Sequence, residues 1–289
     1  MPSLRVDMQG FRNLQEPPAE LGSVRELLVP TRAGQVTVRL YTPRDAPSPS
    51  PLMMHFHGGG WCIGNIEVCD HPCRDLTVTA RCAVASVEYR LAPDTKFPGP
   101  LEDCYDATAW FAAHAADYEI DPDAIAVSGD SAGGNLAACV ALMARDFGGP
   151  RIAFQVLIYP VCSTGISPDL AVDPNAAVVP MLGSKQMDWY RDRYLRSEAD
   201  LRNPYAVPLA ATDLSGLPPA YIASCEWDRL APENVEFARR LRSAGVHVVT
   251  SMFERELHGF FWMGAVRPNY RRLVAEIAQE FARTCNQQS

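Results

Sequence analysis

The hydrophobic pattern near the start of the chain predicts a pair of antiparallel strands. Apolar residues dominate Val24–Val29 and Val36–Tyr41, and in the second segment they alternate with polar residues, so that strand has one wet face. Thr31-Arg32-Ala33-Gly34 lies between them and places a glycine where a tight turn can need a positive φ. We therefore expect a β-hairpin at the beginning of the domain.

From Leu52 onwards, short apolar runs alternate with segments of helical periodicity. The expected strands are Leu52–Phe56, Ala83–Tyr89, the run at Ile125–Val127, Phe154–Tyr159, Ala220–Ser224 and Val246–Phe253, and the expected helices are Asp70–Ala80, Leu101–Ala113, Asn135–Arg145, Pro232–Ala244 and Arg271–Thr284. This alternation predicts an α/β fold with a mostly parallel, doubly wound sheet. We expect a single domain over residues 1–289, opened by the hairpin.

One stretch interrupts this alternation, between Tyr159 and Ala220. It contains a helical pattern over Gly183–Leu195, and an insertion of this length in a compact domain is usually functional. At the other end of the chain, Leu4–Leu14 carries only a weak helical pattern. We expect two cap elements, at about residues 1–22 and 163–212, to form a lid over an active site.

Composition narrows the class of protein. The chain has 289 residues, is 47% hydrophobic and carries a net charge of −8, so it lacks the basic surface that nucleic-acid binding requires. No apolar run reaches the roughly 18 residues of a membrane span, and Met1–Leu14 has no apolar core of a secretory signal. The nine cysteines are scattered without zinc-site spacing, which predicts reduced thiols, a cytoplasmic protein and no metal.

The most informative motif is Gly129-Asp130-Ser131-Ala132-Gly133, between the Ile125 strand and the Asn135 helix. In this setting Gly-x-Ser-x-Gly is the pattern of a nucleophile elbow, whose glycines permit a strained turn that a Cβ would block. The turn would leave the Ser131 hydroxyl at a helix N-terminus, which favours developing negative charge. A glycine-rich helix cap is the alternative interpretation of the motif taken alone.

A second motif, His57-Gly58-Gly59-Gly60-Trp61, follows the Leu52–Phe56 strand directly. Three consecutive glycines free the backbone to turn several N–H groups towards one point. In lipases and esterases such a loop supplies oxyanion donors, together with the N–H of the residue after the nucleophile, here Ala132. A phosphate-binding loop of the Walker type would need Gly-Lys-Ser/Thr, which is absent.

A serine nucleophile needs a base, and only two histidines follow Ser131. His247 alternates with valines in a strand, which favours a structural or solvent-facing position, whereas His258 lies in a turn just beyond that strand. The acid should end the preceding strand, where Glu226 and Asp228 are both available. Position within the motif favours Asp228, with Glu226 making structural hydrogen bonds.

Other polar residues receive structural interpretations. We expect His57 to brace the glycine loop through hydrogen bonds and Asp130 to anchor the elbow. His55, His71 and His114 are also expected to be structural.

Taken together, the motifs resemble the hormone-sensitive lipase family of α/β-hydrolases, in its bacterial carboxylesterase branch, from about Leu52 to the C-terminus. The matching segments are His57-Gly-Gly-Gly-Trp61, Glu88-Tyr-Arg-Leu-Ala-Pro93, Phe97-Pro98, Gly129-Asp-Ser-Ala-Gly-Gly134, Leu214-Ser-Gly-Leu-Pro-Pro219, Asp228 and His258-Gly-Phe260. The resemblance implies the α/β-hydrolase fold and a helical cap. It also implies a catalytic triad of Ser131, Asp228 and His258 and an oxyanion hole formed by Gly59, Gly60 and Ala132.

The sequence departs from the family pattern in four places, one of which is Asn203-Pro204, where Asp-Pro is common. Cys69 stands where the family commonly has a histidine, and Arg229 follows the acid where the family usually has a proline, which could place a cation beside the acid. The N-terminal arm is short for this family. We therefore expect one cap helix to be reduced or missing and the pocket to be more open.

These observations predict a serine carboxylesterase that cleaves small-molecule esters through an acyl-enzyme. By resemblance, short acyl chains are preferred, and Trp61, Trp189 and Tyr190 are candidates to line the pocket. No cofactor or metal is implied, so EDTA should leave the activity intact. One alternative is a deacylase or amidase that tailors natural products with the same triad, and another is a non-catalytic binding module on this fold. Pairing into a homodimer is a further option.

Overall fold

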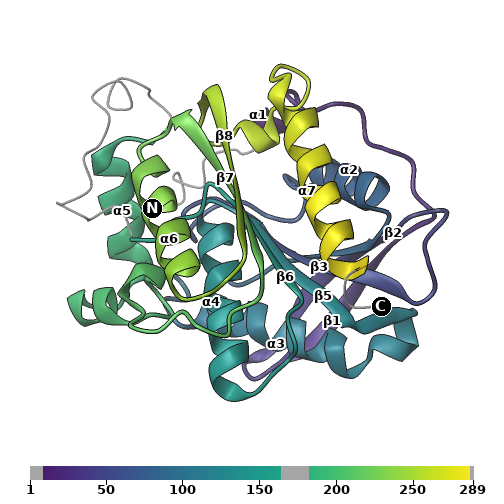
Figure 1. Cartoon of the computed structure of the whole chain (residues 1–289), viewed down its shortest axis with the longest axis horizontal. Coiled ribbons are helices and arrows are strands. Elements are labelled where there is room, and N and C mark those ends of the chain that lie inside the picture. Colours follow the sequence, from purple (N-terminus) through teal and green to yellow (C-terminus); the bar gives the residue numbers. More distant parts are fainter. Residues whose placement is uncertain (1–8, 164–181, 287–289) are drawn as a thin grey trace.

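The computed structural model describes residues 9–163 and 182–286, and these form one eight-stranded sheet with helices on both faces (Figure 1). The strands are β1 Ser23–Thr31, β2 Gly34–Thr42, β3 Ser50–Phe56, β4 Ala83–Val87, β5 Ile120–Asp130, β6 Phe154–Ile158, β7 Ala220–Trp227 and β8 Val248–Leu257. Their order in the sheet is β1-β2-β4-β3-β5-β6-β7-β8. Strands β1 and β2 run antiparallel to their neighbours, and the remaining pairs are parallel.

Most of the α-helices pack against the two faces of the sheet. The α-helices are α1 Gln9–Arg12, α2 Asp70–Ala80, α3 Gly99–Ala113, α4 Ala132–Phe147, α5 Ser184–Tyr194, α6 Ala231–Ser243 and α7 Asn269–Asn286, with short 3-10 helices at Ala115–Tyr118, Glu198–Arg202, Pro208–Ala210 and Phe260–Trp262. Helices α2 and α7 pack together on one side of the sheet, while α3, α4 and α6 cover the other (Figure 1). The predicted doubly wound α/β fold with an N-terminal hairpin is confirmed.

Element boundaries follow the predictions closely, with differences at the strand ends. The hairpin turn is as expected, and Gly34 has a φ of 131°. Strand β7 continues three residues beyond the predicted Ser224, to Trp227, and β8 begins at Val248, so His247 lies just before the strand and is exposed. Both strands are long because they pair with each other as far as Trp227 and Leu257.

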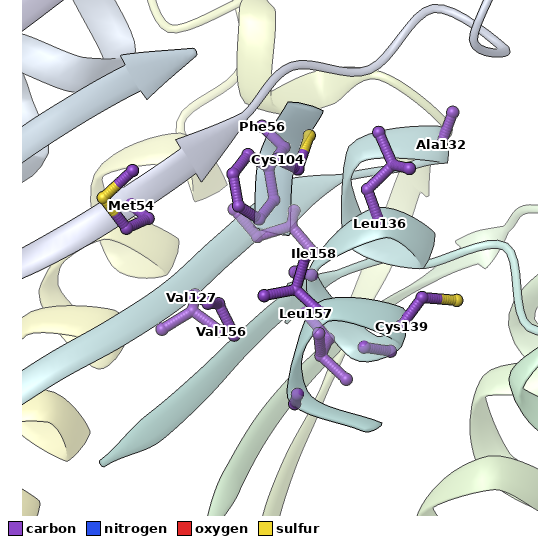
Figure 2. Packing of buried hydrophobic residues seen from close by; sticks show 14 of the residues in the cluster. Met54, Phe56, Cys104, Val127, Ala132, Leu136, Cys139, Val156, Leu157 and Ile158 are labelled. Carbon is purple, nitrogen blue, oxygen red and sulfur yellow. The ribbon is translucent and has the colours of Figure 1, made fainter. Parts of the chain in front are cut away.

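Helix α4 occupies the centre of the core. Its residues from Ala132 to Ala144 are all buried, so it behaves as a helix that is apolar all round. Figure 2 shows Leu136 and Cys139 of this helix beside Leu157 and Ile158 of β6. The alanine-rich sequence is what allows the helix to pack closely on the sheet.

Helix α7 has the opposite character, with one apolar stripe and one exposed face. Tyr270, Leu273, Ile277 and Phe281 are buried at spacings of three and four residues, as an amphipathic surface helix requires. Across the described ranges, no helix combines the length and apolar character needed to cross a bilayer. The cysteines from Cys62 to Cys225 are buried, and none of them forms a disulfide within the described residues.

The expected cap elements are described only in part. The segment 163–212 contains α5, much as the Gly183–Leu195 pattern predicted, but its residues 164–181 lie outside the described residues. Of the weak pattern at Leu4–Leu14, the described part forms the single turn α1.

Candidate active site

Ser131 lies at the sharp turn between the end of β5 and the start of α4. Its backbone has φ 55° and ψ −118°, a strained conformation for a residue with a side chain. The Ser131 N–H donates to the carbonyl of Ile158 at 2.9 Å, and the Ser131 carbonyl accepts the N–H of Val161 at 3.1 Å. The loop after β6 therefore holds the turn in place.

The two glycines of the motif are required by close backbone contacts. A Cβ on Gly133 would lie 1.9 Å from the carbonyl oxygen of Phe56, at the end of β3. A Cβ on Gly129 would lie 2.3 Å from the backbone of Gly133. Because no side chain fits at either position, the serine turn can pack directly against the neighbouring strand.

Three side chains from three strand ends meet at this turn. His258 follows β8, and its Nε2 lies 2.8 Å from the Oγ of Ser131. Asp228 follows β7, and its Oδ2 lies 2.7 Å from the Nδ1 of His258. The other oxygen of Asp228 accepts the N–H of Leu230 at 3.0 Å, which fixes the carboxylate. The arrangement can move a proton from the serine to a histidine whose tautomer the carboxylate sets.

Glu226, the other candidate acid, lies outside this arrangement. It is exposed and accepts the N–H of Arg255 at 2.7 Å, a structural bond as expected. Arg229, the cation expected beside the acid, makes no ion pair with Asp228 within the described chain.

The glycine loop is tied to the elbow by Asp130. The N–H of Gly58 donates to Asp130 Oδ1 at 2.9 Å. Gly59 and Gly60 have φ values of 118° and 58°, and a Cβ on Gly60 would lie 2.3 Å from the ring of Tyr190. The loop is therefore held against both β5 and α5, with Gly59 and Gly60 facing the same cavity as Ser131.

An apolar cavity of about 270 Å³ opens above Ser131 and His258. Its other walls come mainly from the glycine loop, α5 and the segment after His258, and they include Phe11, Trp61, Ile63, Val161, Leu182, Met187, Tyr190 and Trp262. Phe11 of α1 and Met187 of α5 thus bring both expected cap regions to the cavity. A small apolar ligand with one polar group beside Ser131 fits these walls.

Comparison with known proteins agrees with this geometry. A family model described as the alpha/beta hydrolase fold matches residues 53–262. The chain belongs to the hormone-sensitive lipase family of α/β-hydrolases. Esterase LipI of Mycobacterium tuberculosis is 39% identical over 267 residues, covering 90% of this chain and 82% of that protein.

Solved structures of family members superpose on nearly the whole of this chain. An esterase of the archaeon Pyrobaculum calidifontis gives a TM-score of 0.87 at 38% identity, covering 95% of this chain and 87% of that one. EstE1, a thermostable carboxylesterase cloned from a metagenomic library, gives 0.89 at 35% identity, covering 97% and 96%. The fold is therefore shared from the first hairpin to the last helix.

Electrostatics in this hydrolase favour proton uptake by His258. Burial favours the neutral imidazole, but the charge and hydrogen bond of Asp228, with the charges of Asp130 and Glu233, outweigh burial and raise the pKa of His258. Burial also raises the pKa of Asp130 to about 7 and that of Glu233 to about 7. The imidazolium is thus surrounded by acidic groups.

The remaining histidines have structural partners. The ring of His57 stacks on Tyr89 at 4.3 Å between centroids, and its Nδ1 lies 2.7 Å from the carbonyl of Gly58. Burial lowers the pKa of His57 to about 4, so the ring is neutral. His71 and His114 contact the carbonyls of Glu16 and Trp110 at 2.7 and 2.9 Å.

The candidate pocket residues separate into two groups. Trp61 and Tyr190 line the cavity, with Trp61 stacked on Tyr194 at 4.3 Å between centroids. Trp189 does not line the cavity formed by the described residues, which corrects the expectation for it. Trp189 and Tyr190 are consecutive on α5, and consecutive helix residues point in different directions. Tyr190 therefore faces the cavity, whereas Trp189 packs against Arg193.

Some site residues were not singled out from the sequence. Trp262 lines the cavity, and the aromatic run directly after His258 was the available signal. Tyr159 lies 4.8 Å from His258, ring to ring. Glu233 accepts the N–H of Cys162 at 2.7 Å and contacts Ser163, which anchors the loop after β6. Nothing in the sequence marked Glu233 apart from its place in the helix after Asp228.

Proposed function

We propose that Ser131 is the nucleophile of this carboxylesterase, with His258 as general base and Asp228 as the group that orients it. The chain is a carboxylesterase of its family, since relatives named esterase or carboxylesterase match most of it. The observation that carries the assignment is the pair of contacts from His258, 2.8 Å to Ser131 Oγ and 2.7 Å to Asp228.

The proposed reaction has two halves. His258 Nε2 takes the proton of Ser131 as Oγ attacks the ester carbonyl, and the imidazolium then gives that proton to the leaving alcohol. This leaves an acyl group on Ser131. A water molecule then loses its proton to His258 as it attacks the acyl carbon, and the acid and free serine are released.

The oxyanion that forms in each half is proposed to bind the N–H groups of Gly59, Gly60 and Ala132. None of these three N–H groups has a hydrogen-bond acceptor among residues 9–163 and 182–286. Ala132 is the first residue of α4, where N–H groups have no acceptor within the helix. Losing one such donor typically costs about 3 kcal/mol of transition-state stabilisation.

The pH dependence follows from the His258 environment. We expect kcat/KM to fall with decreasing pH through a midpoint above 6.5, because the neutral imidazole is the base and its pKa is raised. Asp228→Asn should move this midpoint to lower pH in the residual activity. Rate profiles with a nitrophenyl ester measure both, and a midpoint below 6.5 in the parent enzyme would contradict the assignment.

The substrate class is proposed to be esters with short acyl chains. The cavity of about 270 Å³ lies below the roughly 300–1,000 Å³ of most ligand pockets, and its walls are apolar. The acyl chain would lie against Met187 and Tyr190. Of the three aromatic residues that motivate the deacylase or amidase alternative, Trp61 and Tyr190 line the cavity, whereas Trp189 packs against Arg193.

A chain-length series tests this specificity. With nitrophenyl esters from acetate upward, kcat/KM should peak at short chains, and Met187→Ala should move the peak to longer ones because it enlarges the cavity. Trp189→Ala is the matched control on the same helix and should leave the peak in place. An anilide of the preferred acyl group tests the amidase alternative. A peak at long chains in the parent enzyme, or equal shifts in both variants, would refute the proposal.

We also infer that the segments at about 1–22 and 163–212 act as a cap and that the enzyme works in the cytoplasm. The cysteines from Cys62 to Cys225, which are buried and free in the described residues, support a reducing compartment. A homodimer is part of the proposal, since β8 is an edge strand of the sheet and its Met252 is 42% exposed, as is Trp227 at the end of the neighbouring β7, at 37%. Cell fractionation and light scattering test these statements, and a secreted or monomeric protein would contradict them.

A further inference from the structure

Three different metal-binding atoms meet on the inner side of the nucleophile turn. His55 of β3, Cys69 just before α2 and Asp130 at the end of β5 bring a nitrogen, a sulfur and an oxygen within 4.8 Å of one another. Each of the three side chains is fully buried, with 0% exposure. The proposed ester hydrolysis does not use this cluster as a unit.

Two of these side chains carry a buried polar atom without a hydrogen-bond partner in the described residues, and His55 Nε2 lies 3.9 Å from Asp130 Oδ1. His55 Nδ1 lies 3.3 Å from Ser128 Oγ, while its Nε2 has no hydrogen-bond partner in the described parts of the chain. Asp130 Oδ1 accepts the Gly58 N–H, while Oδ2 likewise has no partner there. A ligand whose other atom is fixed by a hydrogen bond is the usual arrangement around protein-bound metals.

A neutral imidazole can supply a lone pair to a cation, since one of its two ring nitrogens carries no proton. With Nδ1–H donating to Ser128, that lone pair is on Nε2, the unpartnered atom. Two buried atoms that each lack a partner are costly, and a bound cation would satisfy both.

We propose that His55, Cys69 and Asp130 bind a divalent ion of the zinc type and that the bound ion inhibits the enzyme. Sulfur and imidazole ligands favour Zn²⁺ over Mg²⁺ or Ca²⁺, and three protein ligands leave a fourth position for water. On binding, the Cys69 thiol releases its proton to solvent as the sulfur–metal bond forms, and Asp130 binds as the carboxylate. Binding therefore strengthens as pH rises.

Inhibition follows from the position of Asp130. Its carboxylate holds Gly58 of the glycine loop, and it directly precedes Ser131. A cation bonded to Asp130 competes with Gly58 for this carboxylate and so disturbs the glycine loop beside Ser131. Asp130 and Trp262 also line the substrate cavity, so the cluster borders a space that an ion can enter.

Cobalt binding tests the site without using ester hydrolysis. In a His258→Ala background, which removes the competing histidine of the active site, Co²⁺ titration should give one ion per chain with a thiolate-to-cobalt absorption band. Zn²⁺ should displace it. Cys69→Ser should remove the band and weaken binding by roughly tenfold or more, and His55→Gln should weaken it similarly. Cys73→Ser, at another buried cysteine four residues along, is the matched control and should change nothing.

Activity provides the second readout in the enzyme with His258 present. Zn²⁺ should lower kcat in the parent enzyme and in Cys73→Ser, EDTA should restore it, and Cys69→Ser should be resistant. The proposal is overturned if no thiolate band forms, if Cys73→Ser loses the band, or if Zn²⁺ inhibits Cys69→Ser as strongly as the parent. The spectroscopic result stands independently of whether Ser131 is the nucleophile.

Discussion

Replacement of Ser131 by alanine is expected to lower kcat for ester hydrolysis by about 10⁶-fold, the scale seen when a triad serine is removed. The reason is that Ser131 Oγ is the atom that becomes acylated, and without it His258 Nε2, which lies 2.8 Å from this oxygen, can only activate water directly. Initial rates with a nitrophenyl ester measure the loss. The fold should be retained, because backbone hydrogen bonds of residue 131 with Ile158 and Val161 hold the turn and alanine keeps both of them.

Two controls make this result specific. Ser251→Ala removes a hydroxyl that bonds Glu276 at 2.6 Å, far from the cavity walls, and should leave kcat within a few-fold of the parent. The double variant Ser131→Ala/His258→Ala should be no slower than Ser131→Ala, because the two groups act as a unit. Appreciable turnover by purified Ser131→Ala would mean that another group forms the acyl-enzyme.

Replacement of Asp228 by asparagine is expected to lower kcat by about 10⁴-fold. The amide keeps the shape of the carboxylate but removes its charge, and it can place an N–H against His258 Nδ1, which forces the wrong tautomer at a contact of 2.7 Å. KM should change little, because Asp228 does not line the cavity. Steady-state kinetics of the purified variant separate the two constants.

Glu226→Gln is the matched control for this effect. Glu226 lies two residues earlier on the same strand end, is exposed, and bonds only a backbone N–H of Arg255. Its replacement should change kcat by no more than a few-fold. Should Glu226→Gln lose as much activity as Asp228→Asn, the carboxylate assignment made here would be wrong.

Much of this site could be read from the sequence because the fold places strand ends together. Ser131, Asp228 and His258 each follow a strand of a parallel sheet, and the carboxyl ends of such strands share one edge. The glycines of the motif also predict part of the site, the tight turn at Ser131. Gly129 and Gly133 fit because a Cβ at either would meet backbone atoms, a demand that only glycine satisfies.

What the sequence did not predict depends on tertiary packing. Trp189 and Tyr190 are adjacent in sequence, and only the position of α5 over the glycine loop decides that Tyr190 faces the cavity. The cluster of His55, Cys69 and Asp130 joins residues that are far apart in the chain. Cys69 departs from the family pattern, but sequence spacing does not identify the residues that surround it.

The most direct test of the central claim is to trap the nucleophile. A fluorophosphonate should add one phosphonyl group per chain, and peptide mass spectrometry should place it on Ser131. The rate of labelling should fall by orders of magnitude in His258→Ala and be unchanged in Glu226→Gln, because only His258 removes the Ser131 proton. Labelling at another residue, or undiminished labelling of Ser131 in His258→Ala, would contradict the account.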